Sequence, residues 1–180
     1  MTATDKPPKD YIDAVDVPGE LTLKPIGILH CPYRERHGTP HQAVVATKQS
    51  QHEGVFATLT LREDISQDVL LGFSGIEYVW IISWLHLNHH YNATVIPPRG
   101  PRVRRGVLAT RAPHRPNSIG LSAVRLIGIS GSVMELGPVD LLDCTPVLDV
   151  KPYVPYADAF PNASAGYIDG LGPISRVDEG

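Results

Sequence analysis

The sequence predicts a mainly β protein, a single small barrel or rolled sheet with one or two short helices. Short runs rich in Val, Ile, Leu and Thr recur along most of the chain, which is typical of strands. The 180 residues include 16 glycines and 17 prolines, which is high for a helical bundle and natural for a turn-rich sheet. Strands do not alternate regularly with helices, so a doubly wound fold is disfavoured.

Short apolar segments carry the strand signal, and the strongest is 76–87, which is rich in Ile, Val, Trp and Tyr. Gly131 offers a turn between the segments 126–130 and 133–136. The segments expected to form strands are 23–29, 43–47, 55–61, 76–87, 107–110, 119–126, 126–130, 133–136, 139–143 and 147–150.

The segment 64–73 is the one clear helix. Asp64 and Gln67 have capping-box spacing, and apolar residues follow at a near-helical period. The segment 95–105 is expected to form a long basic loop, because its three prolines prevent regular pairing.

The length indicates one domain, expected over residues 21–170. The polar segment 1–20 is expected to be a flexible arm, and 171–180 a C-terminal tail. The N-terminus lacks the apolar core of a secretory signal, and no uncharged apolar run reaches membrane-spanning length. Two cysteines, Cys31 and Cys144, without CxxC spacing argue against a disulfide scaffold or a zinc ribbon, so the cytoplasm is the simplest compartment.

The stretch 106–126 concentrates polar chemistry between two apolar runs. Arg111, His114, Arg115 and Asn117 fall together here, more densely than a solvent loop needs. The alternative is that these side chains merely decorate an exposed turn.

Six arginines also fall within seventeen residues that contain no Asp or Glu: Arg99, Arg102, Arg104, Arg105, Arg111 and Arg115. In a chain with a net charge of −3, that concentration favours a polyanionic partner, because guanidinium matches phosphate oxygens in a bidentate manner. A solvated loop is the alternative.

The remaining candidate sites are weaker. His86, His89 and His90 cluster at the end of a predicted strand, but the spacing lacks the one-face geometry of a helical zinc motif, so no metal site is predicted. Four carboxylates near the C-terminus could bind ribose hydroxyls or a cation, or could cap turns; they are Asp140, Asp143, Asp149 and Asp158. No dinucleotide-binding glycine motif and no activated Ser or Cys is evident, and the catalytic residue stays unknown.

Four segments together resemble a known family. They are PIGILHCPYRERHGTPHQ (25–42), FSGIEYVWIISWLH (73–86), GVLATRAPHRPNSIGLSAV (106–124) and DLLDCTPVLDVKPYVPYAD (140–158). In this order they are similar to the blocks of the TrmO/TsaA family of S-adenosylmethionine-dependent tRNA methyltransferases.

The resemblance implies a TsaA-like β-barrel of mostly antiparallel strands that works as a homodimer. The implied reaction is methylation of N6 of threonylcarbamoyladenosine beside the tRNA anticodon. The implied cofactor contacts are Pro40, His41, Gln42, His86, Leu87, Arg111, Leu121, Asp143, Cys144, Thr145 and Pro146. Many relatives carry an additional C-terminal domain, which this chain is expected to lack.

Roles follow as hypotheses. Arg111 would hold the methionine carboxylate or a phosphate. Asp143 would bind the ribose or the amino group of the cofactor. Arg115 and Asn117 would shape the adenosine pocket or brace its loop. Arg102, Arg104 and Arg105 would follow the tRNA backbone phosphates.

At four positions the sequence departs from the family pattern. The family usually has Arg, His and Pro where His41, Gly75 and Ser118 stand, and Gly where Cys144 stands. Because Gly tolerates positive φ, the change at Cys144 raises the expectation of a reshaped turn.

Two other functions stay open. The protein could be a module that binds S-adenosylmethionine or tRNA without chemistry, or a methyltransferase of the same fold acting on another substrate. A histidine-metal hydrolase is a further alternative, which stoichiometric metal would reveal.

Overall fold

The computed structural model describes residues 19–35 and 56–171. Residues 1–18 of the predicted arm (1–20), the predicted strand at 43–47 and residues 172–180 of the predicted tail (171–180) lie outside these ranges. The described strands are β1 (Gly27–His30), β2 (Ala57–Leu61), β3 (Tyr78–Trp84), β4 (Thr94–Val95), β5 (Arg105–Gly106), β6 (Ile119–Ser130), β7 (Val133–Leu136) and β8 (Thr145–Pro152). The helices are η1 (Gln67–Leu70), η2 (Val107–Ala109), α2 (Pro155–Asp158) and η3 (Gly166–Leu171).

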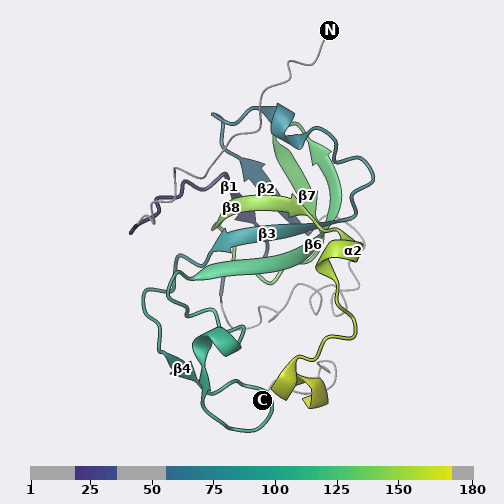
Figure 1. Ribbon diagram of the computed structural model, residues 1–180. Helices are drawn as coiled ribbons and strands as arrows, with labels where there is room; N and C mark the ends of the chain where they lie inside the picture. Colours follow the sequence, from purple (N-terminus) through teal and green to yellow (C-terminus); the bar gives the residue numbers. More distant parts are fainter. Residues whose placement is uncertain (1–18, 36–55, 172–180) are drawn as a thin grey trace, which may run out of the picture.

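Six strands form a closed barrel in the order β1-β2-β7-β6-β3-β8 (Figure 1). Every neighbouring pair is antiparallel, including β1 with β8, which completes the ring. The mainly β, antiparallel architecture with short helices is therefore confirmed. No described helix has the length and apolar character needed to cross a bilayer.

The core fills the barrel because inward side chains alternate with outward ones along each strand. On β3, for example, Val79, Ile81 and Ser83 are buried, and the residues between them are more exposed. The fully buried apolar side chains include Leu29, Leu59, Val79, Ile81, Val124, Met134, Leu136, Val139 and Val147.

One end of the barrel gathers the connections that contain the predicted site residues. The registers place the C-termini of β1, β3 and β7 beside the N-termini of β2, β8 and β6 at this end. We call it the site end. Residues 31–35, 85–118 and 137–144 all leave the barrel here, and residue 56 leads into β2 at the same end.

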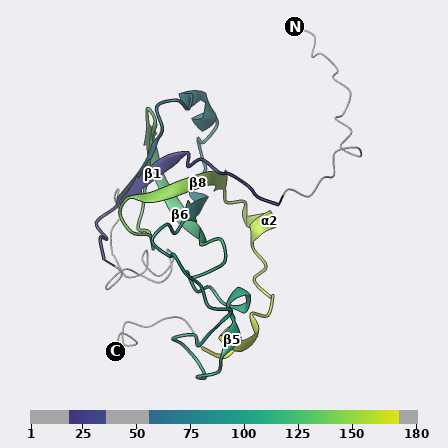
Figure 2. The same cartoon turned by 90° about the vertical axis from the view of Figure 1, so that its left-hand side faces the viewer.

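A smaller lobe extends from the site end. The segment 85–118 carries the two-stranded β4–β5 ladder and η2, and the C-terminal segment runs down from α2 to lie beside it (Figures 1 and 2). Val95 pairs with Arg105, so the predicted basic loop is shorter than expected, and its three prolines lie between the paired ends.

Two predicted strands are wrong. At 107–110 the chain forms η2, because Val107 is buried and Thr110 N–H donates to its carbonyl at 3.1 Å. At 139–143 the chain is irregular: Val139 and Leu141 both turn into the core, and Asp143 N–H donates to Tyr33 O at 2.6 Å.

The predicted helix at 64–73 contracts to the single turn η1. Asp64 does not cap it, because its carboxylate pairs with Arg62 Nε at 2.7 Å and with Lys24 Nζ at 3.2 Å. Ser66 caps η1 instead, accepting from the N–H of Asp68.

Candidate functional site

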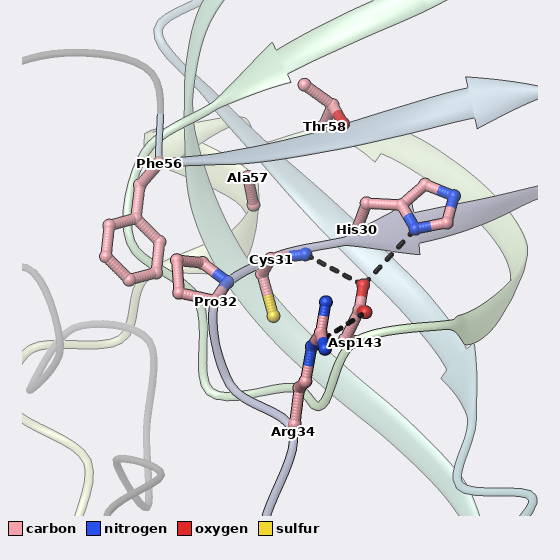
Figure 3. A pocket seen from close by; sticks show the side chains of 8 residues that line it. All are labelled: His30, Cys31, Pro32, Arg34, Phe56, Ala57, Thr58 and Asp143. Carbon is pink, nitrogen blue, oxygen red and sulfur yellow. Dashed lines mark hydrogen bonds and ion pairs between the residues drawn. The ribbon is translucent and has the colours of Figure 1, made fainter.

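Asp143 lies at the site end, in the turn that leads into β8. One carboxylate oxygen accepts the N–H of Cys31 at 3.2 Å and lies 3.2 Å from Nδ1 of His30. The other oxygen is 4.0 Å from Nε of Arg34 (Figure 3). The Cys31 N–H, followed by His30, lowers the pKa of Asp143 against a smaller opposing effect of desolvation. An ionised, oriented carboxylate of this kind accepts hydrogen bonds from hydroxyl or ammonium groups.

Cys144, the next residue, has a φ of 61°. The left-handed conformation that Gly would favour is thus adopted by a residue with a side chain. Thr145 follows, buried, with its hydroxyl donating to Leu142 O at 2.7 Å. Pro146 then pairs with Ile28, which fixes the turn to β1.

A shallow, open pocket of about 410 Å³ adjoins this turn. Figure 3 shows Phe56 and His30 on opposite sides of the view, with Asp143 and Arg34 between them. The residues that line this pocket are His30, Cys31, Pro32, Arg34, Phe56, Ala57, Thr58 and Asp143.

The sequence reasoning missed His30, Arg34 and Phe56 as site residues. His30 alternates with buried Leu29 on β1, so its exposed position could be anticipated. Its contact with Asp143, 113 residues away, could not be anticipated from the sequence, because it depends on the pairing of β1 with β8.

Arg111 and Leu121, two predicted cofactor contacts, do meet. Nη2 of Arg111 donates to the carbonyl of Leu121 at 3.3 Å, and the Leu121 side chain is about half exposed. Leu121 pairs with Ile82 on β3, two residues before Trp84. Arg111 therefore lies beside β6, near the part of this strand that pairs with β3.

His86 and Leu87 lie directly beyond β3, close to the polar stretch 111–118, which we call the knot. Leu85 N–H donates to Ser118 O at 2.8 Å, which joins the two segments. Ser118 is buried with a φ of 47°, a value that proline cannot adopt. The backbone here therefore suits Ser118 and not the proline usual in the resembling family.

Arg115 braces the knot. Its Nη1 donates to the carbonyls of Thr110 at 2.8 Å and of Val107 and Ala112 at 3.4 Å. Of the two roles predicted for this side chain, the geometry favours bracing over substrate contact. Asn117 is exposed on the same knot.

The basic loop is partly covered by the C-terminal segment. The Arg105 guanidinium lies 3.9 Å from the centre of the Tyr167 ring, and Arg99 donates to Leu171 O at 3.0 Å. Arg102 and Arg104 are exposed, and Arg104 donates to Thr94 Oγ1 at 3.1 Å. Arg105 is therefore the least accessible of the three predicted phosphate contacts.

Two further predictions concern residues elsewhere. Pro40, His41 and Gln42 lie outside the described residues. Within 19–35 and 56–171, the His86, His89 and His90 side chains do not gather as metal donors, whereas His30, Asp143 and Cys144 do.

Comparison with known proteins places these features in a family. A family profile described as the tRNA-methyltransferase O N-terminal domain matches residues 28–159. The chain belongs to the TrmO family. The resemblance drawn from the four sequence segments is thereby confirmed.

Individual TrmO-family relatives agree with this assignment. A mouse tRNA (adenine(37)-N6)-methyltransferase is 38% identical over 151 residues, covering 81% of this chain and 34% of that protein. A putative S-adenosylmethionine-dependent methyltransferase, RcsF, of Pseudomonas aeruginosa is 40% identical over 161 residues, which cover 87% of this chain and 67% of that protein. The crystal structure of TrmO from Pseudomonas aeruginosa matches with a TM-score of 0.69 at 35% identity, and the match covers 86% of this chain and 65% of the TrmO chain. The chain thus spans about a third of the mouse relative's length and about two thirds of the bacterial ones.

Proposed function

We propose that this protein is an S-adenosylmethionine-dependent methyltransferase that acts on N6 of threonylcarbamoyladenosine at tRNA position 37. It would work in the cytoplasm as a homodimer. The observation that carries the proposal is that described parts of the four family segments reach the site end, where Asp143 leads into β8 and Arg111 lies beside β6. The names of the relatives, a tRNA (adenine(37)-N6)-methyltransferase and S-adenosylmethionine-dependent enzymes, support it.

The described residues suit this cofactor. Asp143 is ionised and held by the Cys31 N–H, so it can accept from the ribose hydroxyls or the amino group. Arg111 is exposed and can pair with the methionine carboxylate. Leu121 offers apolar surface beside Arg111. Pro40 to Gln42, His86, Leu87 and 144–146 complete the proposed contact set.

When bound, S-adenosylmethionine supplies an already activated methyl group on sulfur. The protein's own task is then to hold the two reactants in line and to exclude water, because positioning alone provides much of the rate. Thr145 and Arg115 fix the turns on which the proposed contact residues stand. The residue that accepts the N6 proton stays unassigned.

For the tRNA, the exposed Arg102 and Arg104 would contact backbone phosphates, and Asn117 would face the adenosine. Anticodon-loop bases are unpaired, so presenting the target base costs little. The lobe formed by 85–118 extends from the site end and carries this basic loop beyond the β4–β5 ladder.

A non-catalytic binding module is the second candidate, favoured by Cys144 and Ser118 at positions where the family usually differs. Mass spectrometry of tRNA nucleosides after incubation with S-adenosylmethionine separates the two. A methylated adenosine derivative supports the enzyme, and binding without product supports the module.

A further inference from the structure

We propose that His30, Asp143 and Cys144 form a zinc site. One donor atom from each, an imidazole nitrogen, a carboxylate oxygen and the thiol sulfur, lies within 4.8 Å of both others. The three come from two segments 113 residues apart, which the β1–β8 pairing brings together.

The spacing of these atoms approaches that of a zinc coordination shell. Zn–N and Zn–O bonds of about 2.1 Å and a Zn–S bond of about 2.3 Å imply tetrahedral donor separations of roughly 3.3 to 3.7 Å. His30 Nδ1 and Asp143 Oδ1 are already 3.2 Å apart. The Cys144 thiol is exposed, so its side chain can rotate to close the remaining separation.

Two of the three donors stand on ordered backbone. Asp143 is fixed by its own N–H on Tyr33 O and by the Cys31 N–H on its carboxylate. His30 ends β1, where it pairs with Thr58. Among the described residues, the Arg34 guanidinium lies 4.0 Å from this carboxylate, and its side chain is 84% exposed, so it can move away when a metal enters.

The donor set selects the metal. A thiolate, an imidazole and a carboxylate together suit Zn²⁺ better than the hard cations Mg²⁺ or Ca²⁺, which prefer oxygen ligands alone. Three protein ligands leave a fourth position for water. Binding displaces the thiol proton of Cys144, and His30 coordinates through an unprotonated Nδ1 with its ring proton on Nε2.

Asp143 and Cys144 also belong to the proposed cofactor contacts. If the proposed function holds, zinc and S-adenosylmethionine would therefore compete for the same turn.

The test is a titration of the metal-free, full-length protein with Zn²⁺ alone by calorimetry, and with Co²⁺ alone by absorption spectroscopy. We expect one equivalent of Zn²⁺ and a thiolate-to-cobalt charge-transfer band. Cys144→Gly should weaken zinc binding at least about tenfold and abolish the band, because a ligand is lost. His30→Gln should also weaken binding. Cys31→Ser is the matched control and should bind zinc as the wild type does, since the Cys31 thiol is turned to Leu141 O at 3.1 Å.

Absence of zinc binding, or equal affinity in the Cys144→Gly variant, would overturn the site. Neither result bears on methyl transfer, because the titrations contain neither cofactor nor tRNA. Titrating S-adenosylmethionine into wild-type protein with and without saturating zinc tests the competition. The competition is supported if zinc weakens cofactor binding in the wild type but not in Cys144→Gly. It is contradicted if zinc leaves the cofactor affinity of the wild type unchanged.

Discussion

Cys144 carries backbone strain at the centre of the proposed cofactor turn. Its φ of 61° costs a residue with a Cβ roughly 1 kcal/mol relative to glycine. Cys144→Gly should therefore raise the free energy of unfolding by about 1 kcal/mol in urea denaturation. Cys144→Ala is the matched control, because it removes the thiol and keeps the Cβ. Equal stability of the two variants would show that the turn is not strained.

Arg111 is the second residue whose role can be isolated. Its guanidinium touches one backbone carbonyl, that of Leu121, and is otherwise directed to solvent in the described structure. Arg111→Ala should lower S-adenosylmethionine affinity about tenfold or more in calorimetry, through loss of a charge-assisted contact. The unfolding free energy should change little, because the side chain is exposed. Unaltered cofactor affinity would remove Arg111 from the proposed site.

The sequence predicts Arg111 and Leu121 as separate cofactor contacts, but the hydrogen bond between them is evident only in the structure. The contact of Asp143 with His30 could not be predicted either, since it requires the ring of strands to close. For Arg115 the sequence leaves two roles open, and only its three carbonyl partners favour bracing over substrate binding.

Among the elements, the long strands were the most predictable. The apolar run at 76–87 contains β3, and the predicted strands 119–126 and 126–130 are continuous as β6. The turn at Gly131 between β6 and β7 is also confirmed, with a φ of 59°. The failures at 107–110 and 139–143 are short apolar segments, in which burial of one or two side chains mimics a strand pattern.

The basic loop is the element that the tRNA proposal depends on. Changing Arg102 and Arg104 to Ala should weaken tRNA binding and flatten the slope of log affinity against log salt by about 1 to 2. Arg105→Ala should have a smaller effect on the slope, because its guanidinium lies under Tyr167.

The control for this measurement is a Lys24→Ala, Lys151→Ala variant. It removes the same number of charges from the other end of the barrel, where β1 begins and β8 ends. An equal flattening of the salt-dependence slope in both double variants would mean that the overall positive charge of the protein, and not the basic loop, binds the tRNA.

The short helix α2 is fastened to the barrel by one carboxylate. Asp158 accepts from Trp80 Nε1 at 2.9 Å and from the N–H of Val154 at 2.8 Å. The Val154 N–H, followed by Trp80, lowers the pKa of Asp158. Since the folded-state pKa is depressed, this group stabilises the fold above its unfolded pKa of about 3.9 and loses that contribution as the pH falls through the folded value.

Asp158→Asn should therefore be less stable than the wild type at neutral pH, and the difference should shrink at about pH 3. Urea unfolding at the two pH values measures both quantities. A stability difference that stays constant with pH would show that the ionised carboxylate contributes nothing.

At the scale of the whole molecule, the closed ring of strands explains why distant segments form one region. Antiparallel pairing sends alternate connections to the two ends of the barrel, and residues 31–35, 85–118 and 137–144 share one end. The fold thereby brings described parts of the four family segments to that end. Their order in the sequence indicated a family, whereas their common end is a consequence of topology.

The most direct test of the proposed function uses two tRNA preparations that differ only in the threonylcarbamoyl group on adenosine 37. Each is incubated with the full-length protein and S-adenosylmethionine, digested to nucleosides and analysed by mass spectrometry, with Arg111→Ala protein as the control. We predict one added methyl group on threonylcarbamoyladenosine, no product from the unmodified tRNA and much less product with Arg111→Ala. Absence of methylation from both preparations, with the cofactor shown to bind, would contradict the proposed methyltransferase.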